Sequence, residues 1–460
     1  MSRPLHVLLT NITLGARTGT ELYVRDVALG LLRRGHRPAV YTPEAGPIAT
    51  ELRAAAVPVA TDVSELTEIP DVIHGHHHQQ TMAALLRFPG VPGIFVAHDR
   101  VAWHDAPPRF PRIRRYVAVD GANRERLIQE GGIPPEGVEV HFNAVDLARF
   151  AARPPLPERP RHALLFSNYA REDTHLPAVR EACRRAGLPL DVLGAGVGRP
   201  VAAPEEVLGG YDLVFAKGRC ALEALAVGAA VVLCDIEGLG PMVTLAQLEE
   251  LRWWNFGRRA LGNPLVPDLV LRQIERYDAA DAVAVCRRVR ETAGLDLALE
   301  RLVQLYESVL AEAAESAAAG DGGSPEALAA ELRAAGAYLH AWSSWQPHLR
   351  SLVDDIDGQR QKLDLRVREL EAESARLREG GEQTRQIAAE RDALRAELGA
   401  VRQSAVESDD LRAELGYLQG TATWRLRGAL LQLPGVRPAW QALRPVFRAP
   451  RRLGGRPDSA

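Results

Sequence analysis

The chain has 460 residues, of which 46% are apolar and 25% charged, so we expect two to four globular domains and exclude a disordered or fibrous chain. Its 56 basic and 59 acidic residues leave a formal net charge of −3, which gives no global reason to expect nucleic acid as a partner. The four cysteines lack CxxC spacing, which argues against a disulfide framework or a zinc knuckle and fits a reducing cytoplasm.

Residues 1–150 alternate short apolar runs with helical stretches. A helix is predicted over 20–34, with Gly35 at its C-cap. We read the N-terminal apolar stretch as the first strand and not as a signal peptide. This alternation predicts a parallel sheet with helices on both faces, in an N-terminal Rossmann-like domain. The predicted strands are 5–10, 38–42, 71–74, 93–97 and 116–119.

A second α/β domain is predicted over 151–315, and its proline-rich start at 151–160 is a linker that marks the domain boundary. Helices are expected between its strands, including 222–227, and one long helix from 282 to about 314 closes this half. No apolar run approaches the roughly 20 residues of a membrane-spanning helix. The predicted strands are 163–166, 190–193, 212–215 and 230–233.

The sequence changes character after a small, Gly-rich segment at 317–324. Apolar residues then recur at seven-residue spacing among charged neighbours, which predicts an α-helical coiled coil over 325–420. Gly380-Gly381 interrupts the heptads. We expect a homo-oligomer through this coiled coil, and an intramolecular helical hairpin about the two glycines is the alternative. The heptad positions are Leu349, Ile356, Leu363, Leu370 and Leu377.

Residues 421–460 form a basic tail in which arginines are interleaved with Trp and Phe. This pattern is typical of an interfacial helix, and it predicts a peripheral membrane contact through 421–456. Four prolines interrupt the tail, so a solvated, disordered segment is an equal alternative.

Tandem doubly wound domains bind ligands in the crevice at the carboxyl ends of their strands. After the first strand, a loop containing Gly15, Gly19 and Thr20 lets the backbone approach a ligand near a helix N-terminus, which favours an anion. The alternative is a plain strand-to-helix turn with Thr20 as N-cap.

A second loop, which begins with Lys217, Gly218 and Arg219, follows a predicted strand and opens a helix. Two cations at a helix N-terminus suit a diphosphate, and Glu223 lies where a carboxylate could accept hydrogen bonds from a ribose. Lys217 is one of only two lysines in the chain, with Lys362. The alternative is a pair of solvated cations with Glu223 as a dipole partner.

Histidines gather near the ends of two predicted strands. His74, His76, His77 and His78 suggest a metal site, but neighbouring strand residues point to opposite faces, so we expect no metal and a loop that lines the cleft. His98 ends another strand on the predicted cleft side, where it could meet substrate; the alternative is a loop histidine bonded to backbone.

Several segments resemble the family 4 retaining glycosyltransferases of the GT-B fold over about residues 3–312. The most specific is 117–150, and the others are the opening strand with its Gly-rich loop and Glu21, then 31–43, 71–76 and 221–228. The resemblance implies two Rossmann-like domains, retention of configuration and no cofactor or obligate metal.

The resemblance also implies site residues. Glu223 matches the family glutamate that binds the nucleotide ribose. Phe215 stands in place of the other family glutamate, and Asn168 in place of an arginine that grips the diphosphate. Arg171 is the nearby candidate for that grip, and we expect Lys217 and Arg219 to supply the missing charge.

We therefore expect a cytoplasmic enzyme of polysaccharide biosynthesis that moves a sugar from a UDP- or GDP-sugar to a glycan or lipid-linked envelope acceptor. Lys217, Arg219 and the helix N-terminus would stabilise the departing diphosphate, and His98 would contact the sugar. The alternatives are an inactive GT-B scaffold that acts through its coiled coil, and a sugar-nucleotide epimerase.

Overall fold

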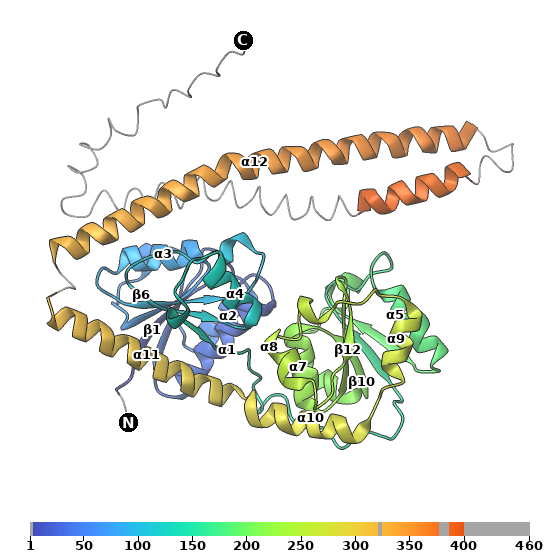
Figure 1. Ribbon diagram of the computed structural model, residues 1–460, viewed down its shortest axis with the longest axis horizontal. Helices are drawn as coiled ribbons and strands as arrows, with labels where there is room; N and C mark the ends of the chain where they lie inside the picture. Colours follow the sequence, from blue (N-terminus) through green and yellow to red (C-terminus); the bar gives the residue numbers. More distant parts are fainter. Residues whose placement is uncertain (1–2, 321–323, 377–385, 400–460) are drawn as a thin grey trace, which may run out of the picture. The chain divides into compact units, whose positions relative to one another are not determined.

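The computed structural model describes residues 3–320, 324–376 and 386–399 (Figure 1). The chain divides into a first compact unit, Met1–Ala335, and a second, Gly336–Ala460. The first contains two α/β domains in tandem, each with a largely parallel sheet, and an α-helical region follows them. The predicted fold class, two Rossmann-like doubly wound domains before a helical region, is confirmed.

The N-terminal domain has a seven-stranded, fully parallel sheet in the order β3-β2-β1-β4-β5-β6-β7. Strands β4 and β5 are buried along their whole length, because helices cover both faces of the sheet. The sequence did not predict the short strands β3 and β7, which form its two edges. The strands are β1 (His6–Thr10), β2 (Arg37–Tyr41), β3 (Val59–Ala60), β4 (Val72–His76), β5 (Gly93–Ala97), β6 (Ile113–Ala118) and β7 (Val138–Val140).

The helices of this domain follow their strands closely. The longest, α1, buries one apolar stripe on the sheet, including Val24, Val27 and Leu31, as its periodicity predicts. The helices are α1 (Gly19–Arg33), α2 (Pro47–Ala54), α3 (His78–Arg87) and α4 (Gly121–Gln129), with 3-10 turns η1 (Val63–Glu65), η2 (Trp103–Asp105) and η3 (Pro135–Gly137).

The C-terminal domain has a five-stranded sheet in the order β12-β11-β10-β8-β9, in which only β12 is antiparallel. The sequence did not predict β12, which returns along β11 after a tight turn. The strands are β8 (Ala163–Phe166), β9 (Leu190–Leu193), β10 (Leu213–Ala216), β11 (Ala230–Asp235) and β12 (Gly238–Met242).

The C-terminal domain has its own apolar core on both faces of the sheet. Its helices are α5 (Leu176–Arg185), α6 (Pro204–Val207), α7 (Gly218–Val227), α8 (Leu248–Trp253), α9 (Pro267–Ile274) and α10 (Ala279–Thr292), with 3-10 turns η4 (Ala195–Val197), η5 (Leu208–Gly210) and η6 (Arg258–Ala260).

The prediction of one long helix over 282–314 is wrong. The chain forms α10, breaks at Gly294 and continues as α11 (Leu295–Ala318). The break coincides with a return to the N-terminal domain, whose core includes Leu299, Leu302 and Tyr306 of α11. The backbones of Val145 and Leu295 are hydrogen-bonded (2.8 Å), so the two passages of the chain between the domains lie side by side.

Each sheet has one point where the strand order reverses. In the N-terminal sheet it lies between β1 and β4, and in the C-terminal sheet between β8 and β10. Connections leave in opposite directions there, which opens a crevice at the carboxyl ends of the two strands. The loops after these four strands are therefore where we place candidate site residues.

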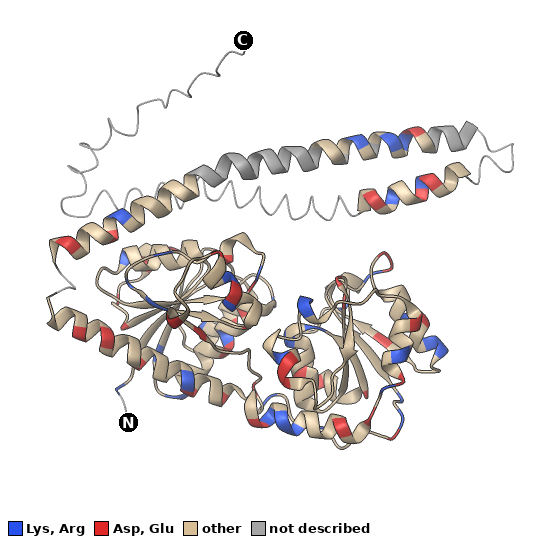
Figure 2. Cartoon of the chain, viewed as in Figure 1, with Lys and Arg blue, Asp and Glu red and all other residues tan. Residues whose placement is uncertain are grey.

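Helix α12 (Pro325–Arg376) begins in the first unit, and most of it belongs to the second. Residues 386–399 of the second unit are also helical. Arg366 contacts Glu390 (3.3 Å), a contact between these helical segments of the kind that the hairpin alternative predicts. Within the described ranges, no helix is long and apolar enough to cross a membrane. The basic tail 421–460 lies outside them. Figure 2 shows acidic and basic residues intermixed over both α/β domains.

Candidate functional site

The N-terminus of α7 lies beside the reversal point of the C-terminal sheet. Lys217 is the N-cap residue, with extended backbone, and Gly218 begins the helix at φ +56°. This left-handed conformation favours glycine, which explains the residue type. The Gly218 N–H donates to the Phe256 carbonyl (3.0 Å), so one of the helix's first N–H groups is already bonded.

Arg219 and Glu223 lie one helical turn apart and contact each other, with Nε donating to Oε1 at 2.8 Å. The other side of the Arg219 guanidinium donates to Asp26 of α1, in the N-terminal domain. All three side chains are largely buried. Burial raises the pKa of Glu223, against the effect of Arg219. The cation predicted to meet a diphosphate is thus held between two carboxylates.

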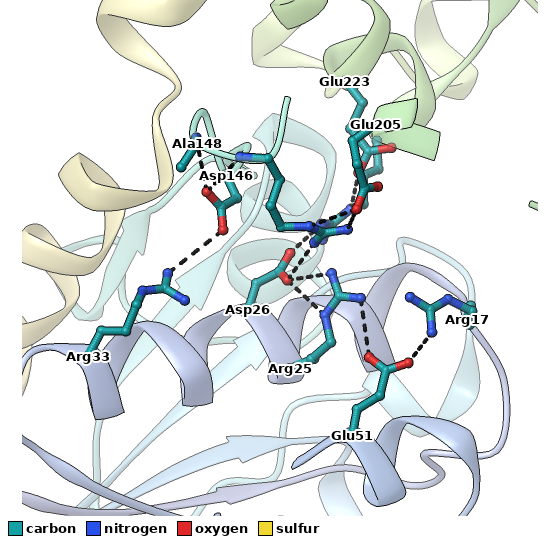
Figure 3. Close-up of polar contacts among 11 residues, drawn as sticks. Arg17, Arg25, Asp26, Arg33, Glu51, Asp146, Ala148, Glu205 and Glu223 are labelled. Carbon is teal, nitrogen blue, oxygen red and sulfur yellow. Dashed lines mark hydrogen bonds and ion pairs between the residues drawn. The ribbon is translucent and has the colours of Figure 1, made fainter. Parts of the chain in front are cut away.

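Figure 3 shows that this pair belongs to a larger network between the domains, which sequence reasoning missed. Asp26 also accepts from Arg25 (2.7 Å) and lies 3.6 Å from Arg149. Arg149 in turn donates to Glu205 (2.7 Å). Burial opposes ionisation of Asp26, but Arg219 and Arg25 hold its pKa below the ordinary value. These charges stabilise one another in pairs.

Lys217 is bound in a second cluster. Its Nζ lies 2.7 Å from Asp235 and 2.6 Å from Glu237, both at the end of β11. The ring of Tyr169, 48% exposed, lies 5.5 Å from the same Nζ. Burial opposes the charged amine, but the two carboxylates raise the pKa of Lys217. Lys217 is therefore an ammonium ion, already paired.

Asn168, Arg171 and Phe215, which the sequence resemblance placed at the donor, are held by contacts within the protein. Asn168 accepts from the Ala195 N–H (3.0 Å) and so holds the loop after β9. Arg171 is 34% exposed, and its Nε donates to Asp173 (3.0 Å). Phe215 is fully buried in β10. Neither Asn168 nor Phe215 can supply a charge to a donor.

The Gly-rich loop after β1 leads into α1. The Gly15 N–H donates to the Thr13 hydroxyl (2.8 Å), and space is open around Gly19. The N-cap of α1 is Thr18, so the alternative with Thr20 in that role is wrong. The Thr20 hydroxyl contacts Glu21 instead (3.2 Å). The Thr18 hydroxyl also donates to the Glu21 carboxylate.

The histidine run does not form a loop that lines the cleft, because His74 and His76 are part of β4 and are fully buried, with ring centroids 4.5 Å apart. His98 Nε2 lies 2.7 Å from His76 Nδ1, and Tyr306 of α11 contacts His74. Burial lowers the pKa of His98 and of His74 to about 3, so both are neutral. The described residues contain no group of three or more ligands placed to hold a metal ion.

A buried carboxyl lies beside this histidine cluster. Asp105 is 1% exposed and accepts from the His98 N–H (3.0 Å). Its other oxygen lies 3.9 Å from Nε2 of His77, which has a positive φ of 58°. Burial raises the pKa of Asp105 to about 7. A group whose pKa is near neutrality at the carboxyl edge of a parallel sheet is a candidate for proton transfer, and no sequence motif marked it.

The loop between α8 and η6 also joins the domains. Trp253 packs against Gly121, where a Cβ would overlap the indole. Asn143 donates to Asn255 (3.2 Å). Contacts of both domains therefore surround the α7 N-terminus, and the structure brings Lys217, Gly218, Arg219 and Glu223 together there. It places Gly15, Gly19, Thr20 and His98 at the N-terminal sheet's carboxyl edge, and Arg171 on the loop after β8.

Residues 17–149 match the family model described as Glycosyltransferase Family 4, which covers most of the N-terminal domain. Among curated proteins, none matches the sequence significantly. Similar solved structures include a glycosyltransferase from Rickettsia africae (15% identity, TM-score 0.45, 67% of this chain and 99% of that one). Another is Anabaena HepE in complex with UDP and glucose (15% identity, TM-score 0.49, 66% of this chain and 100% of that one). A third is MurG of Acinetobacter baumannii (13% identity, TM-score 0.41, 66% of this chain and 100% of that one). Similarities at this level do not extend to substrate or mechanism.

Proposed function

We propose that the protein is a glycosyltransferase that transfers a sugar from a nucleotide diphosphate sugar to a glycan or lipid-linked acceptor. The observation that carries the proposal is the α7 N-terminus, where a helix dipole, Arg219 and a buried Glu223 lie together beside a sheet reversal point. The match of residues 17–149 to a glycosyltransferase family model supports the same reaction class.

In this proposal, Glu223 accepts hydrogen bonds from the ribose diol, and the α7 dipole faces the diphosphate. Transfer requires departure of a diphosphate, so the site must stabilise the negative charge that develops on it. Arg219 can do so only by exchanging its contact with Asp26 for a phosphate oxygen. Donor binding is therefore coupled to the contact between the domains.

The finer features of the reaction follow from the family resemblance. We propose that the sugar is transferred with retention of configuration, without an obligate metal, and in the cytoplasm. The acceptor would approach the N-terminal sheet, where His98 and Asp105 lie at the carboxyl ends of the strands.

Nucleotide binding tests the proposal. The melting temperature of the full chain is measured with UDP, GDP, UDP-glucose and GDP-mannose, and product release is followed with the two sugars. We expect one nucleotide to stabilise the wild type, and Glu223→Gln to weaken that binding at least tenfold. Glu250→Gln, on α8, is the matched control. Equal binding by wild type and Glu223→Gln contradicts the assigned ribose contact.

A non-catalytic scaffold is the second candidate, because Phe215 is buried and both predicted cations are paired with carboxylates. In that case, neither nucleotide nor nucleotide sugar stabilises the chain.

We also propose that the helical region assembles the protein into a homo-oligomer. Light scattering decides between this and the hairpin supported by Arg366 and Glu390, because a monomer mass excludes the oligomer.

A further inference from the structure

A compact polar cluster occupies the carboxyl edge of the C-terminal sheet, and we call it the Lys217 cluster. Its members come from the ends of three neighbouring strands and from the N-cap of α5, which brings them to the reversal point between β8 and β10. Ligands of doubly wound sheets bind at such points. The members are Ser167, His175, Lys217, Asp235 and Glu237.

The charges of the cluster differ in exposure, and we call its buried part the floor and its exposed part the rim. Asp235 is 1% exposed, accepts from the Ser167 hydroxyl (2.9 Å) and binds Lys217 (2.7 Å). Glu237 binds Lys217 from the outer side, and 21% of its side chain is exposed. Arg258, at the rim, lies 3.3 Å from Glu237. The ammonium ion is therefore balanced before any ligand arrives.

His175 forms part of the floor and has spare hydrogen-bonding capacity. Only 1% of its side chain is exposed, and its Nε2 faces Asp235 at 3.8 Å. Within the described residues, neither ring nitrogen of His175 has a hydrogen-bond partner. Buried polar atoms are rarely left unbonded in native proteins, so this histidine indicates a place where a hydroxyl group or a water is bound.

A diphosphate does not suit this cluster, because its charges would lie beside two carboxylates that already neutralise Lys217. Neutral hydroxyl groups do suit it: they can donate to the carboxylates and accept from the ammonium without displacing either charge. Tyr169 adds an exposed aromatic face at the rim. Hydroxyl groups on an apolar ring carbon frame are the chemistry of a sugar.

We infer that the Lys217 cluster binds the hydroxyl groups of the donor's sugar, and that Glu237 is the residue that determines sugar specificity. This inference rests on the proposed transferase function and assigns Lys217 to the sugar instead of the diphosphate. Glu237 is the more exposed carboxylate of the pair, with 21% of its side chain exposed, whereas Asp235 is buried and bonded to both Ser167 and Lys217. Glu237 is therefore the carboxylate that substrate hydroxyl groups can reach more easily.

Calorimetry on the full chain separates the sugar from the nucleotide. Affinities for UDP, UDP-glucose, GDP and GDP-mannose are measured for wild type, Glu237→Ala and Glu237→Gln. In the nucleotide pair that binds wild type, we expect Glu237→Ala to weaken the sugar nucleotide about tenfold or more and to leave the nucleotide unchanged, since a charged hydrogen bond is lost. Glu237→Gln, which keeps the shape, should lose less. Glu275→Ala, at an exposed position, is the control.

The outcomes are distinct. A sugar-nucleotide affinity that Glu237→Ala leaves unchanged overturns the inference and leaves the proposed function intact. An equal gain for nucleotide and sugar nucleotide places the diphosphate at the cluster, and an equal loss is not specific to the sugar; either result also overturns the inference. Absence of binding of all four compounds to the wild type defeats the proposed function, and the inference with it. Melting temperatures of both Glu237 variants report whether the fold is kept.

Discussion

The carboxylate of Asp26 on α1 and the guanidinium of Arg219 on α7 contact each other across the two α/β domains, 193 positions apart in the sequence. Both side chains are largely buried, at 7% and 14% exposed. A buried pair of this kind is strongly destabilised when one partner is removed, because the other charge is left without compensation. Asp26 also occupies the side of the Arg219 guanidinium that does not contact Glu223.

Replacement of Asp26 with Asn should therefore have two opposite effects. We expect unfolding to become easier by about 1–3 kcal/mol, since Arg219 keeps Glu223 but loses a charged hydrogen bond. Affinity for the nucleotide should rise, because Arg219 no longer has to leave Asp26 to meet a phosphate. Urea unfolding and calorimetry with UDP and GDP measure the two effects.

Asp296→Asn is the matched control, because Asp296 pairs with Arg34 at an exposed site (2.6 Å) and does not contact α7. Exposed ion pairs contribute little to stability, so this variant should differ from wild type by less than about 1 kcal/mol. If Asp26→Asn binds nucleotides no more tightly than Asp296→Asn, Arg219 is a domain contact and not a diphosphate ligand.

Phe215 stands where the family resemblance implies a glutamate, so the resemblance alone would predict that Phe215→Glu raises activity. The structure predicts the opposite. Introducing the glutamate that the resemblance implies at this position, with Phe215→Glu, should not improve the proposed transfer. Phe215 lies in the central strand β10 and is fully buried, so a carboxylate there would be an unpaired charge in the core. We expect a loss of more than about 4 kcal/mol, whereas Phe215→Leu should cost about 1–2 kcal/mol. Soluble yield and urea unfolding measure this. A folded, more active Phe215→Glu enzyme would show that the strand is misassigned.

Most of the fold could be predicted from the sequence, because most of its longer strands are short runs rich in apolar residues and bounded by turns. The parts that were missed have weak local signals. β3 has two residues and β7 three, and Gly238–Met242 contains a proline and two glycines, which are uncommon in strands. The break at Gly294 was missed because apolar spacing continues through it; only the partner domain changes.

The candidate site was predictable only where one segment carries several of its residues. Lys217, Gly218, Arg219 and Glu223 are within seven positions, so a helix N-terminus could be recognised. Asp26 could not, because a charged residue within an amphipathic helix resembles a solvated surface residue. Its role depends on Arg219 in the other domain, and no local pattern records that pairing.

Gly30 sets how closely α11 approaches α1. A Cβ on Gly30 would overlap Cδ1 of Leu299, which is 1% exposed. Ala is favoured over Gly in a helix by about 1 kcal/mol, but overpacking costs about 1–3 kcal/mol, so we expect Gly30→Ala to be destabilising overall. Gly19 lies in the same helix, and a Cβ there would meet no other atom within 4 Å, so Gly19→Ala should not be destabilising.

A double-mutant cycle tests the cause. Leu299→Ala alone should cost about 2–5 kcal/mol, and the double variant Gly30→Ala/Leu299→Ala should cost less than the two single changes together, because the truncated side chain makes room for the new methyl group. Additive costs in urea unfolding would mean that the contact between α1 and α11 is looser than the structure shows.

The buried histidines predict that the fold weakens in mild acid. Burial lowers the pKa of His74, His78 and His98 to about 3, and that of His76 and His77 well below its ordinary value. The unfolded chain therefore binds more protons than the folded one between about pH 3 and 6.5. The free energy of unfolding is therefore not reduced by these histidines above pH 6.5. Below that pH it falls by up to about 1.4 kcal/mol per pH unit for each buried histidine.

Asp105 acts in the opposite direction. Its pKa is raised to about 7, so the folded chain holds that proton more tightly, and stability falls as pH rises from about 4 to 7. Burial also raises the pKa of Glu21, Asp120 and Glu223. It lowers the pKa of His36, His104 and His175 as well. The histidines outnumber the carboxyls, so we expect the free energy of unfolding to drop from pH 7 to pH 5. Urea unfolding across this range measures the slope. His78→Gln should reduce it by up to about 1.4 kcal/mol per pH unit, whereas His162→Gln, at an exposed position, should leave it unchanged. A stability that is constant from pH 7 to pH 5 would mean that these histidines are hydrated in solution.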